Sequence, residues 1–137
     1  MVRLGSVMRS GWRAIQDAEE KIRQELKKSC SCHENSADDS CIPCDKVDLL
    51  LNRLDTSVVY FVPDLRDPIH GPNICAKGAY LGYTVKIGPK AFNPTQCHCL
   101  AATLYHEVLH NTGEDDDTDR RSGAGTLEKR CMSHLCK

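Results

Sequence analysis

Residues 93–113 constrain the fold of this chain more than any other part of its sequence. Asn93 can cap the free N–H groups at the start of a helix, and Pro94 is tolerated at the first helical position. Gly113 can adopt the left-handed conformation that ends a helix. We therefore expect one helix that begins at about residue 94 and ends at residue 111 or 112.

The predicted helix has two chemically different faces. One is an apolar stripe suited to a protein core, made of Cys97, Ala101, Leu104 and Val108. The other is polar and consists of Thr103, His106, Glu107 and His110. The two histidines of this helix therefore lie outside the predicted core stripe.

The polar face has the pattern H-E-x-x-H, which is typical of zinc hydrolases. His106 and His110 are one helical turn apart, so their imidazoles can bind the same cation, and Glu107 lies next to the first of them. This pattern predicts a Zn2+ site. The alternative interpretation is a charged surface helix with two incidental histidines. His33, His70 and His98 show no such spacing and are interpreted as incidental, with His98 at the surface or behind the metal ligands.

The stretch "HEVLHNTGEDD" resembles the extended metzincin signature H-E-x-x-H-x-x-G-x-x-[HD], in its snapalysin-type form with aspartate at the last position. The resemblance implies that His106, His110 and Asp116 bind Zn2+ and that Glu107 is the catalytic general base. Gly113 would provide the turn that brings Asp116 to the metal. Other carboxylates nearby could replace Asp116 as the third ligand: Glu114, Asp115, Asp117 and Asp119.

The same resemblance extends over residues 79–134. "KRCMSH" offers Met132 for the methionine turn of metzincins, and His134 lies where several such families place a tyrosine that stabilises the transition state. The resemblance implies an α+β fold, namely a small zincin or metzincin-like domain whose short twisted sheet packs on helices that include the active-site helix. The order of two strands and then a helix in "VKIGPKAFNP...LAATLYHEVLH" is also similar to small metallopeptidase domains at the C-terminal ends of bacterial secreted toxins and effectors.

In the rest of the chain, the sequence predicts helices and strands that build the core, and we assign no chemistry to them. Apolar spacing predicts helices over residues 12–28 and 45–55, and a β-branched run predicts a buried strand over residues 57–62. Residues 64–77 are interpreted as a loop, and alternation predicts a half-exposed strand over residues 80–88. We expect a single domain, residues 1–137, with a helical, cysteine-rich part up to residue 55 and the strands, zinc helix and methionine turn in residues 56–137.

Nine cysteines in 137 residues indicate covalent or metal cross-linking. Cys30, Cys32, Cys41 and Cys44 lie in a polar stretch that is interpreted as a loop, and either disulfides or a structural zinc ion could hold it. The odd number leaves at least one cysteine without an intramolecular partner. Cys97 and Cys99 are too close in sequence to bond to each other and need separate partners.

Composition limits the partners of this chain. The net charge of −1 gives no general attraction to nucleic acid or to anionic membranes, so no nucleic-acid partner is expected. No apolar run approaches the roughly 18 residues of a membrane span, and no secretory signal is visible at the N-terminus. We expect a monomer that is secreted or translocated, acts on a protein or peptide substrate and can have an inhibitor or immunity protein as partner.

These observations predict a zinc-dependent endopeptidase. An amidase that acts on a cell-wall peptide or another non-protein amide would need the same motif, because the motif specifies hydrolysis and not the substrate. A binding module that metal and cysteines only stabilise is the non-enzymatic alternative.

Overall fold

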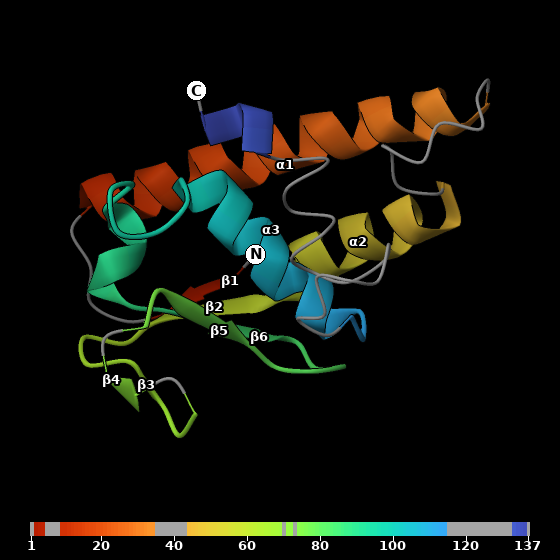
Figure 1. The fold of residues 1–137 in the computed structure, drawn as a ribbon. Helices are drawn as coiled ribbons and strands as arrows, with labels where there is room; N and C mark the ends of the chain where they lie inside the picture. The colour runs from red at the N-terminus through yellow and green to blue at the C-terminus, as the bar shows by residue number, and fades with distance from the viewer. Residues whose placement is uncertain are drawn as a thin grey trace.

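The computed structural model describes residues 2–4, 9–34, 44–69, 71, 72, 74–114 and 133–136. Within these residues, three α-helices lie over one face of a four-stranded sheet, and a small two-stranded sheet lies below it (Figure 1). The α+β part of the fold prediction is therefore confirmed. Helix α3 lies between the sheet and helix α1, and this central position decides which residues the two faces of α3 meet.

Helices α1 (Arg9–Glu34) and α2 (Cys44–Thr56) confirm the two helices predicted in the first half of the chain. Each buries the apolar stripe that its periodicity indicates. The prediction that residue 29 begins a loop was wrong, because α1 continues to Glu34. Residues 29–34 contain neither glycine nor proline, so nothing in them stops a helix. The side chains of Cys30, Cys32, Cys41 and Cys44 lie outside the described residues, and so does the choice between disulfides and zinc there.

The main sheet has the order β1-β2-β6-β5. Strands β1 (Val2–Leu4), β2 (Val58–Phe61) and β6 (Thr84–Ile87) are parallel, and β5 (Ala76–Gly78) runs antiparallel to β6. Strand β2 confirms the strand predicted at residues 57–62. The small sheet pairs β3 (Arg66–Asp67) with β4 (Gly71–Pro72). The predicted loop at residues 64–77 therefore contains both of these strands and the start of β5.

Strand β6 is shorter than the alternation of residues 80–88 predicts. Residues 80–83 form the turn between β5 and β6, and Leu81 in this turn has a φ of 56°. The alternating pattern was misleading there, because large residues of a tight turn can also be exposed on both sides, as Tyr80 and Tyr83 are. The sheet edge beside α3 is therefore formed by β5, whereas β6 lies between β2 and β5.

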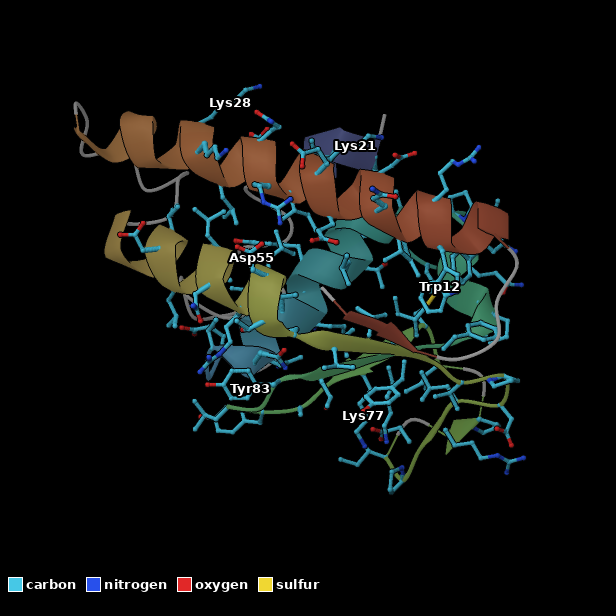
Figure 2. All side chains as sticks on the ribbon, turned by 180° about the vertical axis from the view of Figure 1, so that it is seen from behind. Trp12, Lys21, Lys28, Asp55, Lys77 and Tyr83 are labelled. Atoms are coloured by element: carbon cyan, nitrogen blue, oxygen red, sulfur yellow. A yellow bond between two sulfur atoms is a disulfide. The ribbon has the colours of Figure 1, made fainter. Side chains whose placement is uncertain are left out.

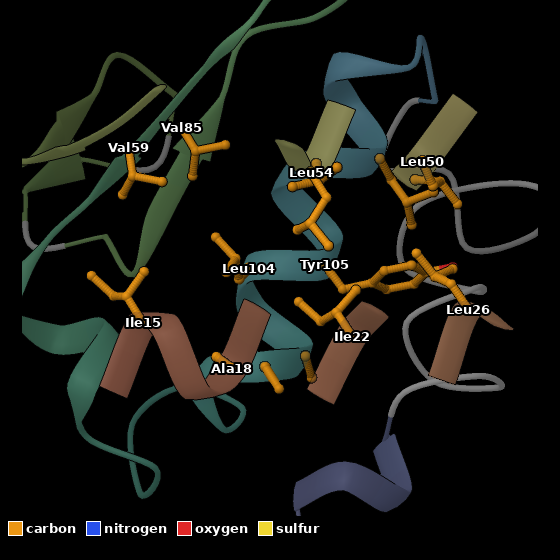
Figure 3. Close-up of a cluster of buried hydrophobic side chains, with 14 of the residues drawn as sticks. Ile15, Ala18, Ile22, Leu26, Leu50, Leu54, Val59, Val85, Leu104 and Tyr105 are labelled. Carbon is orange, nitrogen blue, oxygen red and sulfur yellow. The ribbon is translucent and has the colours of Figure 1, made fainter. Parts of the chain in front are cut away.

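The hydrophobic core lies between the three helices and the sheet. Figure 3 shows Leu104 and Tyr105 of α3 among side chains of α1, α2, β2 and β6. Both side chains are fully buried, with 0% of their surface exposed. This core confirms that Ala101, Leu104 and Val108 form an apolar stripe. A short helical turn, η3 (Ser133–Cys136), also contacts α3, and its Leu135 packs against the core.

Candidate metal centre

Helix α3 (Leu100–Asn111) carries the candidate centre and begins later than predicted. Asn93 does cap, but it caps a turn: its Oδ1 accepts hydrogen bonds from the N–H of Thr95 at 3.0 Å and from the Thr95 hydroxyl at 2.7 Å. The helix itself starts after Cys99, which has an extended backbone. The helix starts late because Cys97 and Cys99, which lie just before it, both form disulfide bonds with other parts of the chain.

The end of α3 is as predicted. Gly113 has a φ of 95°, the left-handed conformation that favours glycine. The N–H of Gly113 donates to the carbonyl oxygen of His110 at 3.0 Å, and the N–H of Glu114 donates to that of Leu109 at 3.1 Å. The chain thus turns sharply after the second histidine. Asp116, the predicted third ligand, lies beyond this turn and outside the described residues.

His106 and His110 lie side by side on α3, with ring centroids 4.9 Å apart and both side chains half-buried. Nδ1 of His110 donates a hydrogen bond to the backbone carbonyl oxygen of Glu114 at 2.7 Å. A carbonyl only accepts, so this bond fixes the proton on Nδ1 and leaves the lone pair of Nε2 for a cation. Metal-binding histidines are commonly oriented in this way, and the residues present fit a metal ion.

Glu107 lies between the two histidines and is only 8% exposed. Its Oε2 accepts a hydrogen bond from the backbone N–H of Gly78, at the end of β5, at 2.7 Å. Gly78 must be glycine, because a Cβ at this position would collide with the backbone carbonyl of Glu107. Ligand atoms of His106, Glu107 and His110 all lie within 4.8 Å of one another, so this group could hold a metal ion.

Asn111 joins the end of α3 to the sheet. This side chain is fully buried, and its Oδ1 accepts a hydrogen bond from the Ser57 hydroxyl at 2.8 Å. Its Nδ2 donates to the carbonyl oxygens of Ala79 at 2.8 Å and Thr84 at 3.2 Å. Since Ala79 directly follows Gly78, the Asn111 amide holds the part of β5 that binds Glu107. The buried amide has partners at both of its ends.

A cleft of about 670 Å³ opens between α3 and β5, and we call it the α3–β5 cleft. His106, Glu107 and His110 line it on the α3 side. The opposite side includes Asp67 and Lys77, whose side chains form an ion pair of 3.1 Å. Figure 2 shows Lys77 on the side of the sheet that faces away from α1. This ion pair connects β5 to the β3–β4 sheet.

A smaller hollow of about 260 Å³ adjoins this cleft and is called here the His98 hollow. It shares four residues with the α3–β5 cleft: Cys75, Ala76, His106 and Glu107. Its other lining residues are Cys97, His98 and Thr103. His106 and Glu107 of the candidate metal group therefore border both the α3–β5 cleft and the His98 hollow.

Two disulfides border the site, and they confirm that Cys97 and Cys99 have separate partners. Cys97 is bonded to Cys75, which directly precedes β5. Cys99 is bonded to Cys136 in η3. The segment that leads into α3 is therefore linked covalently to the edge of the sheet and to the C-terminal turn.

The other predicted site residues are only partly placed. The backbone of His134 belongs to η3, which packs on α3, but its side chain lies outside the described residues, as does the whole of Met132. Asp115, Asp117 and Asp119 also lie outside the described residues. Their roles stay predictions.

Sequence reasoning missed Gly78 and Asn111. Gly78 lies in the stretch interpreted as a loop, 29 residues before Glu107, and no local pattern connects the two. Asn111 follows the second histidine directly, but an asparagine at the end of a helix is commonplace. A single sequence offers no signal for either contact.

Comparison of the chain with protein-family models, with curated proteins and with solved structures finds no match. Among the described residues, no helix combines the length and apolar character that a membrane span requires. The geometry of the site is therefore the basis on which a function can be proposed for this protein.

Proposed function

We propose that this protein is a zinc-dependent endopeptidase. One observation carries the proposal: His106, Glu107 and His110 bring their ligand atoms within 4.8 Å of one another in a cleft of about 670 Å³. An accessible cleft argues for chemistry, because a purely structural metal site is usually closed by four protein ligands.

His106 and His110 would bind the metal ion, His110 through Nε2. A carboxylate beyond Gly113 would complete the ligand set, with Asp116 as the first choice. Bound zinc supplies a Lewis acid and lowers the pKa of coordinated water from about 15.7 towards 7. Zinc is favoured over other metals because imidazole ligands suit it and the ion has no redox chemistry of its own.

Glu107 would be the general base. The hydrogen bond from Gly78 holds one carboxylate oxygen, Oε2, and thereby orients the whole group. The carboxylate would take a proton from the attacking water and return it to the leaving amine. A general base held in place loses little entropy when the substrate binds.

The position of β5 supports a peptide as substrate. Strand β5 is the edge of the main sheet, and three residues that line the cleft belong to it: Ala76, Lys77 and Gly78. An extended peptide could bind along such an edge by main-chain hydrogen bonds. An antiparallel edge strand beside the helix of the two histidines also supports the zincin-like, metzincin-like fold as a proposal.

The two disulfides favour an oxidising environment, in agreement with a secreted or translocated protein. We extend the proposal to a toxin or effector that acts as a monomer on a protein substrate and can be blocked by an inhibitor or immunity protein. The resemblance of the strand-then-helix order in residues 85–110 to metallopeptidase domains of secreted toxins is the support for this extension.

The substitution Glu107→Gln tests the proposal. Glutamine keeps an oxygen that can accept the hydrogen bond from Gly78 but cannot act as a base, so we expect kcat/KM for peptide hydrolysis to fall about 10²- to 10⁴-fold. Zinc content, measured by elemental analysis, and the melting temperature should change little. Glu20→Gln is the matched control, because Glu20 lies exposed on α1.

Two results would contradict the proposal. One is purified wild-type protein that binds no stoichiometric zinc. The other is a Glu107→Gln variant that cleaves peptides as fast as the wild type. If wild-type protein binds zinc but cleaves only non-protein amides, the amidase alternative replaces the endopeptidase.

A further inference from the structure

His98 lies in an unusual covalent setting. Cys97 before it is bonded to Cys75 at the start of β5, and Cys99 after it is bonded to Cys136 in η3. The carbonyl oxygen of His98 also accepts a hydrogen bond from the Thr103 hydroxyl at 3.1 Å. The backbone of His98 is thus fixed on both sides, and its exposed side chain extends from this fixed point.

His98 lines the same hollow as two of the candidate functional residues. The His98 hollow is bordered by His106 and Glu107, and it adjoins the α3–β5 cleft through residues common to both spaces. The sequence predicted His98 to be an incidental residue at the surface or behind the metal ligands, and the structure shows its side chain exposed at the border of this hollow. The proximity arises because the two disulfides attach the segment before α3 to β5 and to η3.

We propose that His98 is a further catalytic residue of this site. Its imidazole N–H would donate a hydrogen bond to the carbonyl oxygen of the scissile peptide bond as negative charge develops there. A donor at this place stabilises the transition state more than the ground state, because the negative charge on the oxygen develops only in the transition state. The inference rests on the proposed peptidase function and assigns to His98 the role that sequence resemblance gave to His134.

Other donors around the site are less suited to this role. Lys77 is held by its ion pair with Asp67 on the opposite side of the cleft. Tyr80 and Lys90 line the α3–β5 cleft but not the His98 hollow. Among the described donors that line the His98 hollow, the Thr103 hydroxyl is already bonded to the carbonyl oxygen of His98, and His98 alone is flanked by two cross-linked residues.

The test compares His98→Ala with His98→Gln. Removal of one oxyanion donor typically lowers kcat about 10²- to 10³-fold, and we expect such a loss in His98→Ala with little change in KM. His98→Gln keeps a side-chain N–H and should lose less. A phosphinic peptide, which imitates the tetrahedral transition state, should bind His98→Ala more weakly by about the same factor as the loss in kcat. Calorimetry measures this affinity without any turnover.

Three further variants serve as controls. Gln96→Ala removes an exposed side chain two residues away that lies outside the His98 hollow, and it should behave as wild type. Tyr60→Phe removes a tyrosine hydroxyl from β2, outside both the cleft and the His98 hollow, and should leave the phosphinic peptide affinity nearly unchanged. His134→Ala tests the rival assignment directly, and a loss of kcat in this variant with none in His98→Ala would overturn the role of His98.

The outcomes separate this inference from the proposed function. If His98→Ala keeps wild-type kcat and phosphinic peptide affinity, the role of His98 is wrong while the peptidase proposal stands. The role is also wrong if the variant loses activity only in proportion to lost zinc or lost folded protein. If wild-type protein neither cleaves peptides nor binds the phosphinic peptide, the proposed function is contradicted and the role of His98 falls with it.

Discussion

The two sides of α3 are held in different ways. The side that faces α1 and α2 presents Leu104, Tyr105 and Leu109, each with 0% of its surface exposed. The side that faces β5 presents His106, Glu107 and His110, which meet main-chain groups and a cleft. Burial of apolar area stabilises the first side, whereas directed hydrogen bonds and cross-links stabilise the second. We therefore expect the first side to govern stability and the second to govern the proposed chemistry.

The largest expected effect on stability comes from the core side. Leu104→Ala should lower the free energy of unfolding by about 2–5 kcal/mol, because it removes buried methyl groups and leaves a cavity. Urea denaturation measures the change. Activity per folded molecule should persist, and its loss would show that the two sides of α3 are not separable. Leu49→Ala is the control, since Leu49 is 37% exposed on α2 and should cost less than about 0.5 kcal/mol.

Loss of either disulfide is expected to have the next largest effect on stability. Cys75 and Cys97 are 22 residues apart in sequence, and Cys99 and Cys136 are 37 apart. By loop-closure entropy, replacement of either pair by serine should lower the free energy of unfolding by about 3–4 kcal/mol. The Cys75–Cys97 pair borders both the cleft and the His98 hollow, so its loss should also weaken the affinity for the phosphinic peptide, measured where the variant is still folded. An unchanged affinity would restrict this disulfide to a structural role.

Ser57→Ala should have a smaller effect on the free energy of unfolding. Ser57 lies where the end of α3 meets the main sheet. The variant leaves the buried Oδ1 of Asn111 without its hydrogen-bond donor, which should cost about 1–3 kcal/mol. Chemical denaturation measures the loss. Thr56→Ala, which removes an exposed hydroxyl one residue earlier, should be nearly neutral. Equal losses in the two variants would argue that the Asn111 contacts do not stabilise the junction of α3 and the sheet.

The smallest effect is expected at the rim of the cleft. Asp67→Asn removes the charge that pairs with Lys77 but keeps an oxygen that can accept the hydrogen bond from the N–H of Ile69, which is 2.7 Å in the native protein. Lys77 is 46% exposed, so the loss should be about 0.2–1 kcal/mol and should disappear in high salt. A loss that does not respond to salt would indicate that Asp67 acts through the shape of the turn and not through its charge.

Local features of the fold could be predicted where the signal lies within one element. The helices of the first half, strand β2, the apolar stripe of α3 and the stop at Gly113 all follow from periodicity or from the preference of a single residue. Predictions failed where distant residues decide the local structure. Helix α3 begins only at Leu100, after the cross-linked Cys97 and Cys99, and strand β6 begins only at Thr84, where its pairing with β2 and β5 starts.

The sequence by itself determined that His106, Glu107 and His110 share one face of a helix, because a helix repeats every 3.6 residues. It also determined that Cys97 and Cys99 need separate partners. Only the tertiary structure decided that Gly78 holds the Glu107 carboxylate, that Asn111 connects α3 to the sheet and that His98 borders the same site. These contacts join residues far apart in the chain, and such contacts depend on how whole elements pack rather than on any local pattern.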